Sequence, residues 1–270
     1  MQDFADDGVC YVELRTTPRA IPTAGISKED YVAIVLNAIH DFCTSPQNLT
    51  DSATATGSKE KKLHANLILS IDRKNSLSEA MEVVHLAAKH RNQGIVGIDL
   101  CGNPTRRPIS HLTPAFTAAR AQDLPITLHF AEIRQETTEE LELMLSWQPQ
   151  RLGHVIHVTE DVRATIAERK LGLELCLSCN VLCKLSQGGF AAHHFGEWWQ
   201  AGGKIALATD DVGIFESGLS EEYLLAAQHF TLDKAQLVVL SRSAVDVIFG
   251  GRDEKERMNL LLGSFLEGKW

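Results

Sequence analysis

Strand-like and helix-like segments alternate along most of this 270-residue chain, and that alternation restricts the fold more than any other feature. The strand-like segments are short, rich in apolar or β-branched residues, and bounded by Gly, Pro, Asn or Asp. We expect strands at residues 9–16, 63–71, 95–101, 125–130, 151–156, 171–177 and 204–209. Helical patterns separate them at 28–42, 77–89, 112–121, 138–145 and 159–169, and the chain is mostly helical from Ser220 onward. Such alternation predicts a parallel sheet within a single α/β domain over residues 1–270.

Seven parallel strands can form an open doubly wound sheet or most of a (β/α) barrel, and the pattern alone leaves both open. With 44% hydrophobic residues, the chain can bury a large core in either fold. The glycine-rich fingerprint of a dinucleotide-binding Rossmann domain is absent from the sequence.

Charge and cysteine content argue against several classes of protein. Thirty-five acidic and 26 basic side chains give a formal charge of −9, whereas binders of nucleic acids or membrane surfaces usually carry a basic face. A small anionic ligand held by one or two arginines remains compatible with this balance. The six cysteines lie scattered through apolar runs, the N-terminus is acidic, and no apolar run reaches the ~18 residues that span a bilayer. We expect a cytoplasmic monomer with no nucleic-acid or membrane partner.

Most of the expected strands have ionisable, polar or small residues at or just after their ends. They are Thr16, Thr17, Pro18 and Arg19, then Asp72, Gly102, His129 with Glu132, His154, and finally Asp210 with Asp211. In barrels and in open α/β sheets alike, ligands bind at the carboxyl ends of the strands. One such residue is more often a structural histidine or a helix cap, but several at the same edge indicate a site.

The chemistry of these residues suits metal-assisted hydrolysis. His129 and Asp210 offer an imidazole and a carboxylate, which are ligands for a metal such as zinc. Glu132 lies one short turn after His129 and can exchange a proton with a substrate ring without binding the metal. His154 can steer or deprotonate a metal-bound water, whose pKa a catalytic zinc lowers to about 7. Asp211, next to Asp210, can hydrogen-bond the substrate.

Seven segments strengthen this interpretation because they occur in the order seen in one family: YVELRTTPR, GIDLCGNP, LHFAEI, RLGHVIH, LELCLSCN, HHFGEWW and ATDDVGIF. Over nearly its whole length the chain resembles the adenosine deaminase family, and most of all the branch that acts on the nucleotide N6-methyl-AMP. The resemblance implies a TIM-type (β/α)8 barrel of the metal-dependent hydrolase kind. It also implies one Zn²⁺ and hydrolytic deamination at C6 of a purine nucleoside monophosphate, with N6-methyl-AMP giving IMP and methylamine.

The resemblance also implies roles for individual residues. His129 and Asp210 become zinc ligands, Glu132 the proton donor to the purine nitrogen N1, and His154 the residue that orients the zinc-bound hydroxide. The implied substrate contacts are the backbone N–H of Gly102, the side chains of Asp72 and Asp211, and, for the 5′-phosphate, Thr16, Thr17, Pro18 and the forked donor Arg19.

One departure from the family concerns the zinc site. In this family two further ligands come from a His-x-His motif on the first barrel strand, and no His-x-His occurs in these 270 residues. We therefore expect a barrel that lacks its first strand, and a zinc site that has only two of its four protein ligands. The alternatives are a truncated gene model or alternative start of an active deaminase, a natural short isoform without activity, and replacement ligands from elsewhere in the chain.

Two other motifs contain potential metal ligands, and both are better explained as structural. Cys176, Cys179 and Cys183 lack the His-x-Glu partner of the nucleobase deaminases. With Cys176 expected inside a strand, residues three apart would point to opposite faces, so we expect buried structural thiols. His193 and His194 precede two tryptophans and are expected to pack where a loop enters a helix.

Three functions remain to be compared. The first is deamination of a purine nucleotide. The second is binding of a nucleotide without catalysis, and the third is deamination of adenosine itself.

Overall fold

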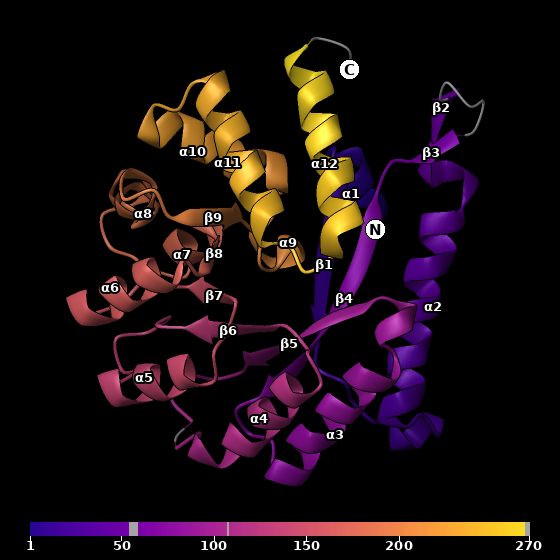
Figure 1. The fold of residues 1–270 in the computed structure, drawn as a ribbon, viewed down its shortest axis with the longest axis vertical. Helices are drawn as coiled ribbons and strands as arrows, with labels where there is room; N and C mark the ends of the chain where they lie inside the picture. Colours follow the sequence, from indigo (N-terminus) through magenta and orange to yellow (C-terminus); the bar gives the residue numbers. More distant parts are fainter. Residues whose placement is uncertain (54–58, 107, 268–270) are drawn as a thin grey trace.

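The computed structural model describes residues 1–53, 59–106 and 108–267. Seven of its strands are parallel neighbours in one sheet, which curls into most of a barrel (Figure 1). These are β1 (Tyr11–Thr16), β4 (His64–Asp72), β5 (Ile95–Cys101), β6 (Ile126–Phe130), β7 (Arg151–His154), β8 (Gly172–Leu175) and β9 (Lys204–Leu207). Spatial order follows chain order from β1 to β9. A doubly wound sheet reverses its strand order at a switch point, so the unbroken order decides for the barrel.

The seven strands correspond to the seven expected from the sequence, with ends that differ by up to two residues, and two of these differences are instructive. The expected strand 151–156 ends at His154, because His154 and Val155 take left-handed backbone conformations that break the ladder. The expected strand 171–177 ends at Leu175, because helix α7 (Leu177–Leu182) begins almost at once. The prediction that Cys176 lies inside a strand is therefore wrong.

Helices surround the outer face of the curled sheet (Figure 1). Five connect the strands as expected: α2 (Lys28–Thr44), α3 (Leu77–Lys89), α4 (Thr113–Ala121), α5 (Thr138–Ser146) and α6 (Glu160–Arg169). The remaining helices are α1 (Gln2–Asp6), α8 (Phe195–Gln200), α9 (Val212–Phe215), α10 (Leu219–Phe230), α11 (Lys234–Val247) and α12 (Gly251–Leu266). Short 3-10 turns occur at Pro22–Ala24, Pro46–Asn48, Arg91–Gln93, Ser110–Leu112 and Phe190–Ala192.

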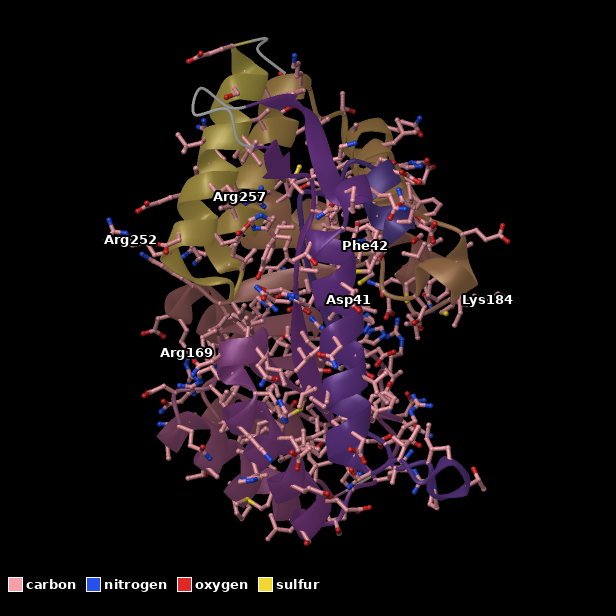
Figure 2. All side chains as sticks on the ribbon, turned by 90° about the vertical axis from the view of Figure 1, so that its right-hand side faces the viewer. Asp41, Phe42, Arg169, Lys184, Arg252 and Arg257 are labelled. Atoms are coloured by element: carbon pink, nitrogen blue, oxygen red, sulfur yellow. The ribbon has the colours of Figure 1, made fainter. Side chains whose placement is uncertain are left out.

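The hydrophobic core lies between the strands and these helices. Leu69 and Ile98 of the sheet and Phe116 of α4 are fully buried in one continuous apolar cluster. Helix α12 carries Arg257 (Figure 2), which donates to the carbonyl oxygen of Cys10, the residue before β1, at 2.7 Å. No helix of the described residues combines the length and apolar character needed to cross a membrane.

The polar segment before β4 forms a small antiparallel pair, β2 (Leu49–Ala53) and β3 (Lys59–Lys61). Asn48 anchors its base, since its side chain bonds both the N–H and the carbonyl of Leu63 at 2.9 Å. Residues 54–58 lie outside the described part of the chain.

Candidate active site

The residues singled out by sequence share the carboxyl edge of the sheet. Thr16, Asp72 and His154 are the last residues of β1, β4 and β7, His129 lies one residue before the end of β6, and Gly102 and Asp210 follow β5 and β9. Parallel strands place all these ends on the same side of the barrel. The fold therefore gathers residues that lie as far as 194 positions apart in the sequence.

His129 is held by two acceptors on its Nδ1 atom. That atom lies 3.1 Å from a carboxylate oxygen of Asp99 and 2.9 Å from the carbonyl oxygen of Leu100. Both partners can only accept, so Nδ1 carries a proton, and in the neutral ring Nε2 is the nitrogen with the lone pair. Asp99 is fully buried, and it also accepts from Ser70 at 2.9 Å and lies 3.7 Å from Arg15.

The two histidines of the site have opposite pKa shifts. Burial lowers the pKa of His129, but the Asp99 carboxylate outweighs it, so the pKa lies above its usual value. Burial and the neighbouring charge of His129 together lower the pKa of His154, against the opposing charges of Glu132 and Asp210. The ring centroids of His129 and His154 are 5.4 Å apart. The arrangement favours a neutral His154 beside a strongly polarised His129.

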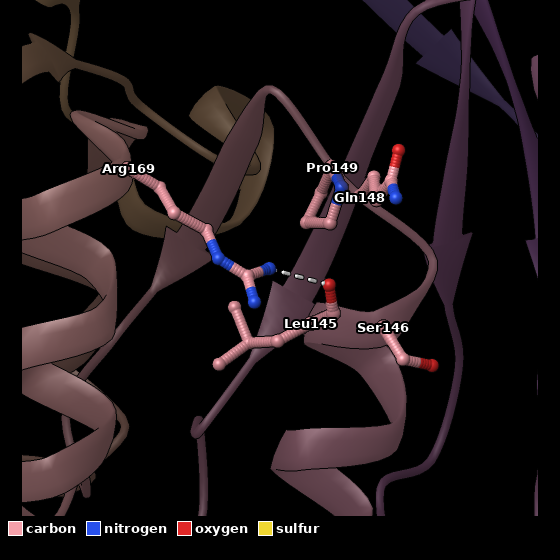
Figure 3. A pocket seen from close by; sticks show the side chains of 5 residues that line it. All are labelled: Leu145, Ser146, Gln148, Pro149 and Arg169. Atoms are coloured by element: carbon pink, nitrogen blue, oxygen red, sulfur yellow. Dashed lines mark hydrogen bonds between the residues drawn. The ribbon is translucent and has the colours of Figure 1, made fainter.

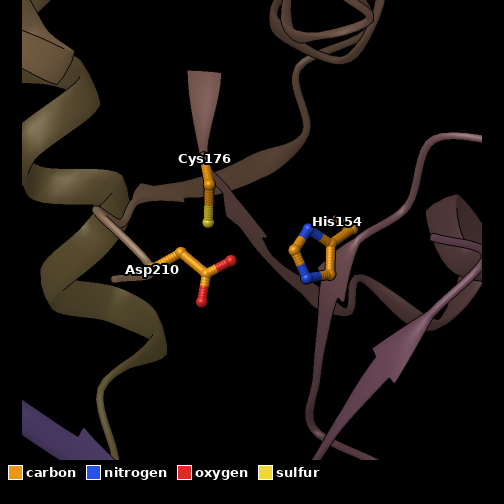
Figure 4. Close-up of side chains that lie close together, drawn as sticks. All are labelled: His154, Cys176 and Asp210. Atoms are coloured by element: carbon orange, nitrogen blue, oxygen red, sulfur yellow. The ribbon is translucent and has the colours of Figure 1, made fainter. Parts of the chain in front are cut away.

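Potential metal-binding atoms of His154, Cys176 and Asp210 all lie within 4.8 Å of one another (Figure 4). Cys179 donates its thiol to a carboxylate oxygen of Asp210 at 3.0 Å. Two of the three cysteines that we assigned to structural packing therefore contact the site, and the third, Cys183, is exposed rather than buried. His129 does not belong to this compact group of three.

Left-handed backbone conformations recur at this edge. Ala131, His154 and Asp210 have φ values of +52°, +63° and +54°, which non-glycine residues adopt rarely. Such strain persists only where the surroundings enforce it, and it concentrates at functional sites.

The loop that carries Glu132 is held in place by a buried ion pair. One oxygen of Glu136 accepts the backbone N–H of Glu132 at 2.7 Å and that of Ile133 at 3.3 Å. Its other oxygen lies 2.7 Å from the guanidinium of Arg73, which directly follows β4 and also pairs with Glu140. Neither Arg73 nor Glu136 was among the expected site residues.

Gly102 and Asp72 lie against each other. Gly102 has a φ of +96°, and a Cβ added to it would lie 2.5 Å from a carboxylate oxygen of Asp72. That carboxylate also accepts the backbone N–H of Lys74 at 2.9 Å. The requirement for glycine here thus arises within the chain itself.

The residues expected around a phosphate lie at the end of β1. The hydroxyl of Thr16 is 2.7 Å from that of Tyr31, and the hydroxyl of Thr17 is 3.4 Å from the thiol of Cys101. Pro18 is buried, whereas Arg19 is exposed with its guanidinium 5.9 Å from the centre of the Tyr31 ring. Asp211 is exposed at the start of α9 and makes no side-chain capping bond there.

Helix α7 is positioned by a residue far away in the sequence. A carboxylate oxygen of Glu222 accepts the backbone N–H of Leu177 at 2.7 Å, and the hydroxyl of Ser217 donates to the other oxygen at 2.9 Å. Negative charge at a helix N-terminus is favourable. Glu222 thereby sets the turn that brings Cys176 and Cys179 to Asp210.

A hollow of about 480 Å³ lies beside the beginning of strands β7 and β8, at the other end of the strands from the carboxyl edge. It is lined by Leu145, Ser146, Gln148, Pro149 and Arg169, at the ends of α5 and α6 and in the loop after α5 (Figure 3). Arg169 already donates to the carbonyl oxygen of Leu145 at 2.8 Å. We do not assign the activity to this hollow.

Comparison with known proteins agrees with the fold and identifies relatives. The family model for adenosine deaminase matches residues 1–262. The N6-mAMP deaminase of Arabidopsis thaliana is 34% identical over 271 residues, covering 98% of this chain and 76% of the relative. The N6-Methyl-AMP deaminase of Danio rerio is 32% identical, covering 96% and 72%. The crystal structure of Arabidopsis ADAL complexed with IMP has a TM-score of 0.88 and 34% identity, covering 97% of this chain and 74% of that one.

Proposed function

Because the chain belongs to the adenosine deaminase family and is a purine deaminase of the hydrolase class, we propose that its substrate is N6-methyl-AMP. Water replaces the methylamino group at C6, and IMP and methylamine are the products. The likeness to N6-methyl-AMP deaminases over nearly the whole chain carries the proposal. The arrangement of His129, Glu132, His154 and Asp210 at one edge of the sheet supports it.

The donor set at this edge fits zinc. His129 presents an Nε2 lone pair because its Nδ1 donates to Asp99 and Leu100, and Asp210 presents an exposed carboxylate. We assign these two residues as the ligands that this chain offers. When bound, zinc supplies a Lewis acid that lowers the pKa of a water to about 7.

The residues of the chain supply orientation and proton transfer. Glu132 donates a proton to purine N1, which makes C6 more electrophilic, and the Arg73–Glu136 pair keeps its loop in place. His154, neutral because burial lowers its pKa, orients the attacking oxygen through a hydrogen bond. Gly102, Asp72 and Asp211 line the approach to the purine, and Thr16, Thr17, Pro18 and Arg19 receive the 5′-phosphate.

Assaying the zinc-supplied protein with N6-methyl-AMP tests this function. We expect a shift of the purine absorbance together with release of methylamine. Glu132→Gln should abolish both, while Glu142→Gln, an exposed carboxylate on α5, should leave them unchanged. Absence of turnover in the folded wild type, or full activity of Glu132→Gln, would refute the proposal, and faster turnover of adenosine would refute the nucleotide specificity.

A further inference from the structure

His154 is connected to a hydrogen-bonded network of buried side chains. The structure has the Nδ1 atom of His154 3.0 Å from Oδ1 of Asn180, and Nδ2 of the same amide 3.1 Å from Nε2 of His193. The backbone N–H of Phe195 in turn donates to Nδ1 of His193 at 3.0 Å. Asn180 is fully buried and His193 nearly so. Water therefore does not compete for these hydrogen bonds.

Only one assignment of donors and acceptors is consistent along this network. A backbone N–H can only donate, so Nδ1 of His193 must accept. Burial lowers the pKa of His193 to about 2, so the ring is neutral and carries its single proton on Nε2. Nε2 must then donate, and the end of the Asn180 amide that faces it must be the oxygen.

The orientation with Oδ1 toward His154 and Nδ2 toward His193 fails, so the two ends of the amide must be exchanged. With the amide nitrogen toward His193, both nitrogens of that ring would have to accept, which leaves an imidazole without a proton. The two ends of an amide have nearly the same shape and are distinguished by their hydrogen bonds. The amide nitrogen of Asn180 therefore faces His154 and donates to its Nδ1.

We infer that Asn180 and His193 are positioning residues that hold His154 in the tautomer with its proton on Nε2. The inference rests on the proposed function, in which His154 faces the reacting atoms. Since Nδ1 is occupied by Asn180, Nε2 is the nitrogen left to act, and in this tautomer it donates a hydrogen bond. His154 then orients the attacking oxygen but neither deprotonates it nor binds a metal through Nε2.

His129 and His154 thus have opposite tautomers. Asp99 and Leu100 fix the proton of His129 on Nδ1 and free its Nε2 as a ligand, whereas Asn180 fixes the proton of His154 on Nε2. The same reasoning removes His154 from the compact group that it forms with Cys176 and Asp210, because a protonated nitrogen has no lone pair for a metal.

Long-range ¹H–¹⁵N correlation spectra of the full chain labelled with ¹⁵N-histidine test the inference. These spectra distinguish protonated from unprotonated ring nitrogens, and a His154→Gln sample identifies the signals of His154. We expect the proton on Nε2 in the wild type. In Asn180→Asp, the new carboxylate should draw the proton to Nδ1.

Activity provides a second readout. Asn180→Asp should lower kcat about 100-fold or more and leave KM nearly unchanged, because Asn180 does not touch the substrate. A wild-type proton on Nδ1, or a folded Asn180→Asp protein with the proton still on Nε2, would overturn the inference. The wild-type spectrum decides even when the variant does not fold. It is recorded without substrate, so failure of the proposed deamination would leave this test intact.

Discussion

Arg73 and Glu136 form a buried ion pair with a nitrogen–oxygen distance of 2.7 Å, and both side chains are 1% exposed. The pair joins the end of β4 to the loop after β6, because the second oxygen of Glu136 holds the backbone N–H of Glu132. A buried arginine thus connects stability to the placement of the proposed proton donor.

Arg73→Met should lower the free energy of unfolding by about 3–5 kcal/mol, since it removes the buried counter-charge of the Glu136 carboxylate. Urea denaturation measures this loss. Arg252→Met is the matched control, because Arg252 and its partner Glu256 are 88% and 60% exposed, and its effect should stay within about 0.5 kcal/mol. A loss below about 1 kcal/mol for Arg73→Met would contradict this account of the pair.

Asp99→Asn should weaken zinc binding about 10- to 100-fold, because the neutral amide no longer fixes the proton of His129 on Nδ1. Competition with a chromophoric chelator measures the affinity. Asp246→Asn removes an exposed carboxylate of α11 and should leave the affinity unchanged. Equal affinities in both variants would show that Asp99 does not orient a ligand.

Gly102→Ala and Gly202→Ala separate backbone strain from a steric clash. Both glycines have left-handed φ values, +96° and +72°, but only Gly102 has a neighbour within 4 Å of an added Cβ. Gly202→Ala should cost about 1 kcal/mol from strain alone, and Gly102→Ala should cost more because Asp72 must move. Thermal unfolding compares the two, and a smaller loss for Gly102→Ala would rule out the close approach.

Acid should destabilise the fold through His194. Burial lowers its pKa to about 4, against a usual value of 6.5, so the folded state resists protonation between these values. The neutral, buried His194 therefore makes its full contribution to stability above pH 6.5. This contribution is lost as the pH falls toward 4, by about 3 kcal/mol at most. Urea midpoints between pH 7.5 and 4.5 measure this slope. His194→Gln keeps a donor for the carbonyl of His154 but cannot titrate, so its slope should be shallower. An unchanged slope would refute a contribution from His194.

The strands were predictable from sequence because short apolar runs bounded by Gly, Pro or Asn depend on local pattern. The exact end of β7 was not, since the left-handed conformations of His154 and Val155 are imposed by tertiary contacts. Helix α7 was missed for a related reason. Its first turn is capped by Glu222, which lies 45 residues after Leu177.

The residues of the candidate site also divide into those that the sequence predicts and those that it does not. His129, Glu132 and Asp210 stand out in the sequence because they lie at or just after the ends of strands. Asp99 and Asn180 do not, because their importance lies in single hydrogen bonds to histidines that are 30 and 26 residues away. A residue that fixes a tautomer leaves no local pattern, and only the folded chain reveals it.

Substitution of Arg19 tests whether the enzyme recognises the 5′-phosphate of its substrate. Arg19→Ala should raise KM for N6-methyl-AMP by about 10- to 100-fold, the loss expected when one charge-assisted hydrogen bond to a phosphate is removed. Activity on the corresponding nucleoside should not change, because the nucleoside has no 5′-phosphate for the guanidinium to bind. Arg134 is also exposed at this edge, in the loop after β6, so Arg134→Ala is the matched control. Steady-state kinetics on both substrates with both variants gives four comparisons. If Arg134→Ala is the variant that selectively loses the nucleotide, the phosphate lies beside β6 rather than β1, and the assignment of Arg19 is wrong.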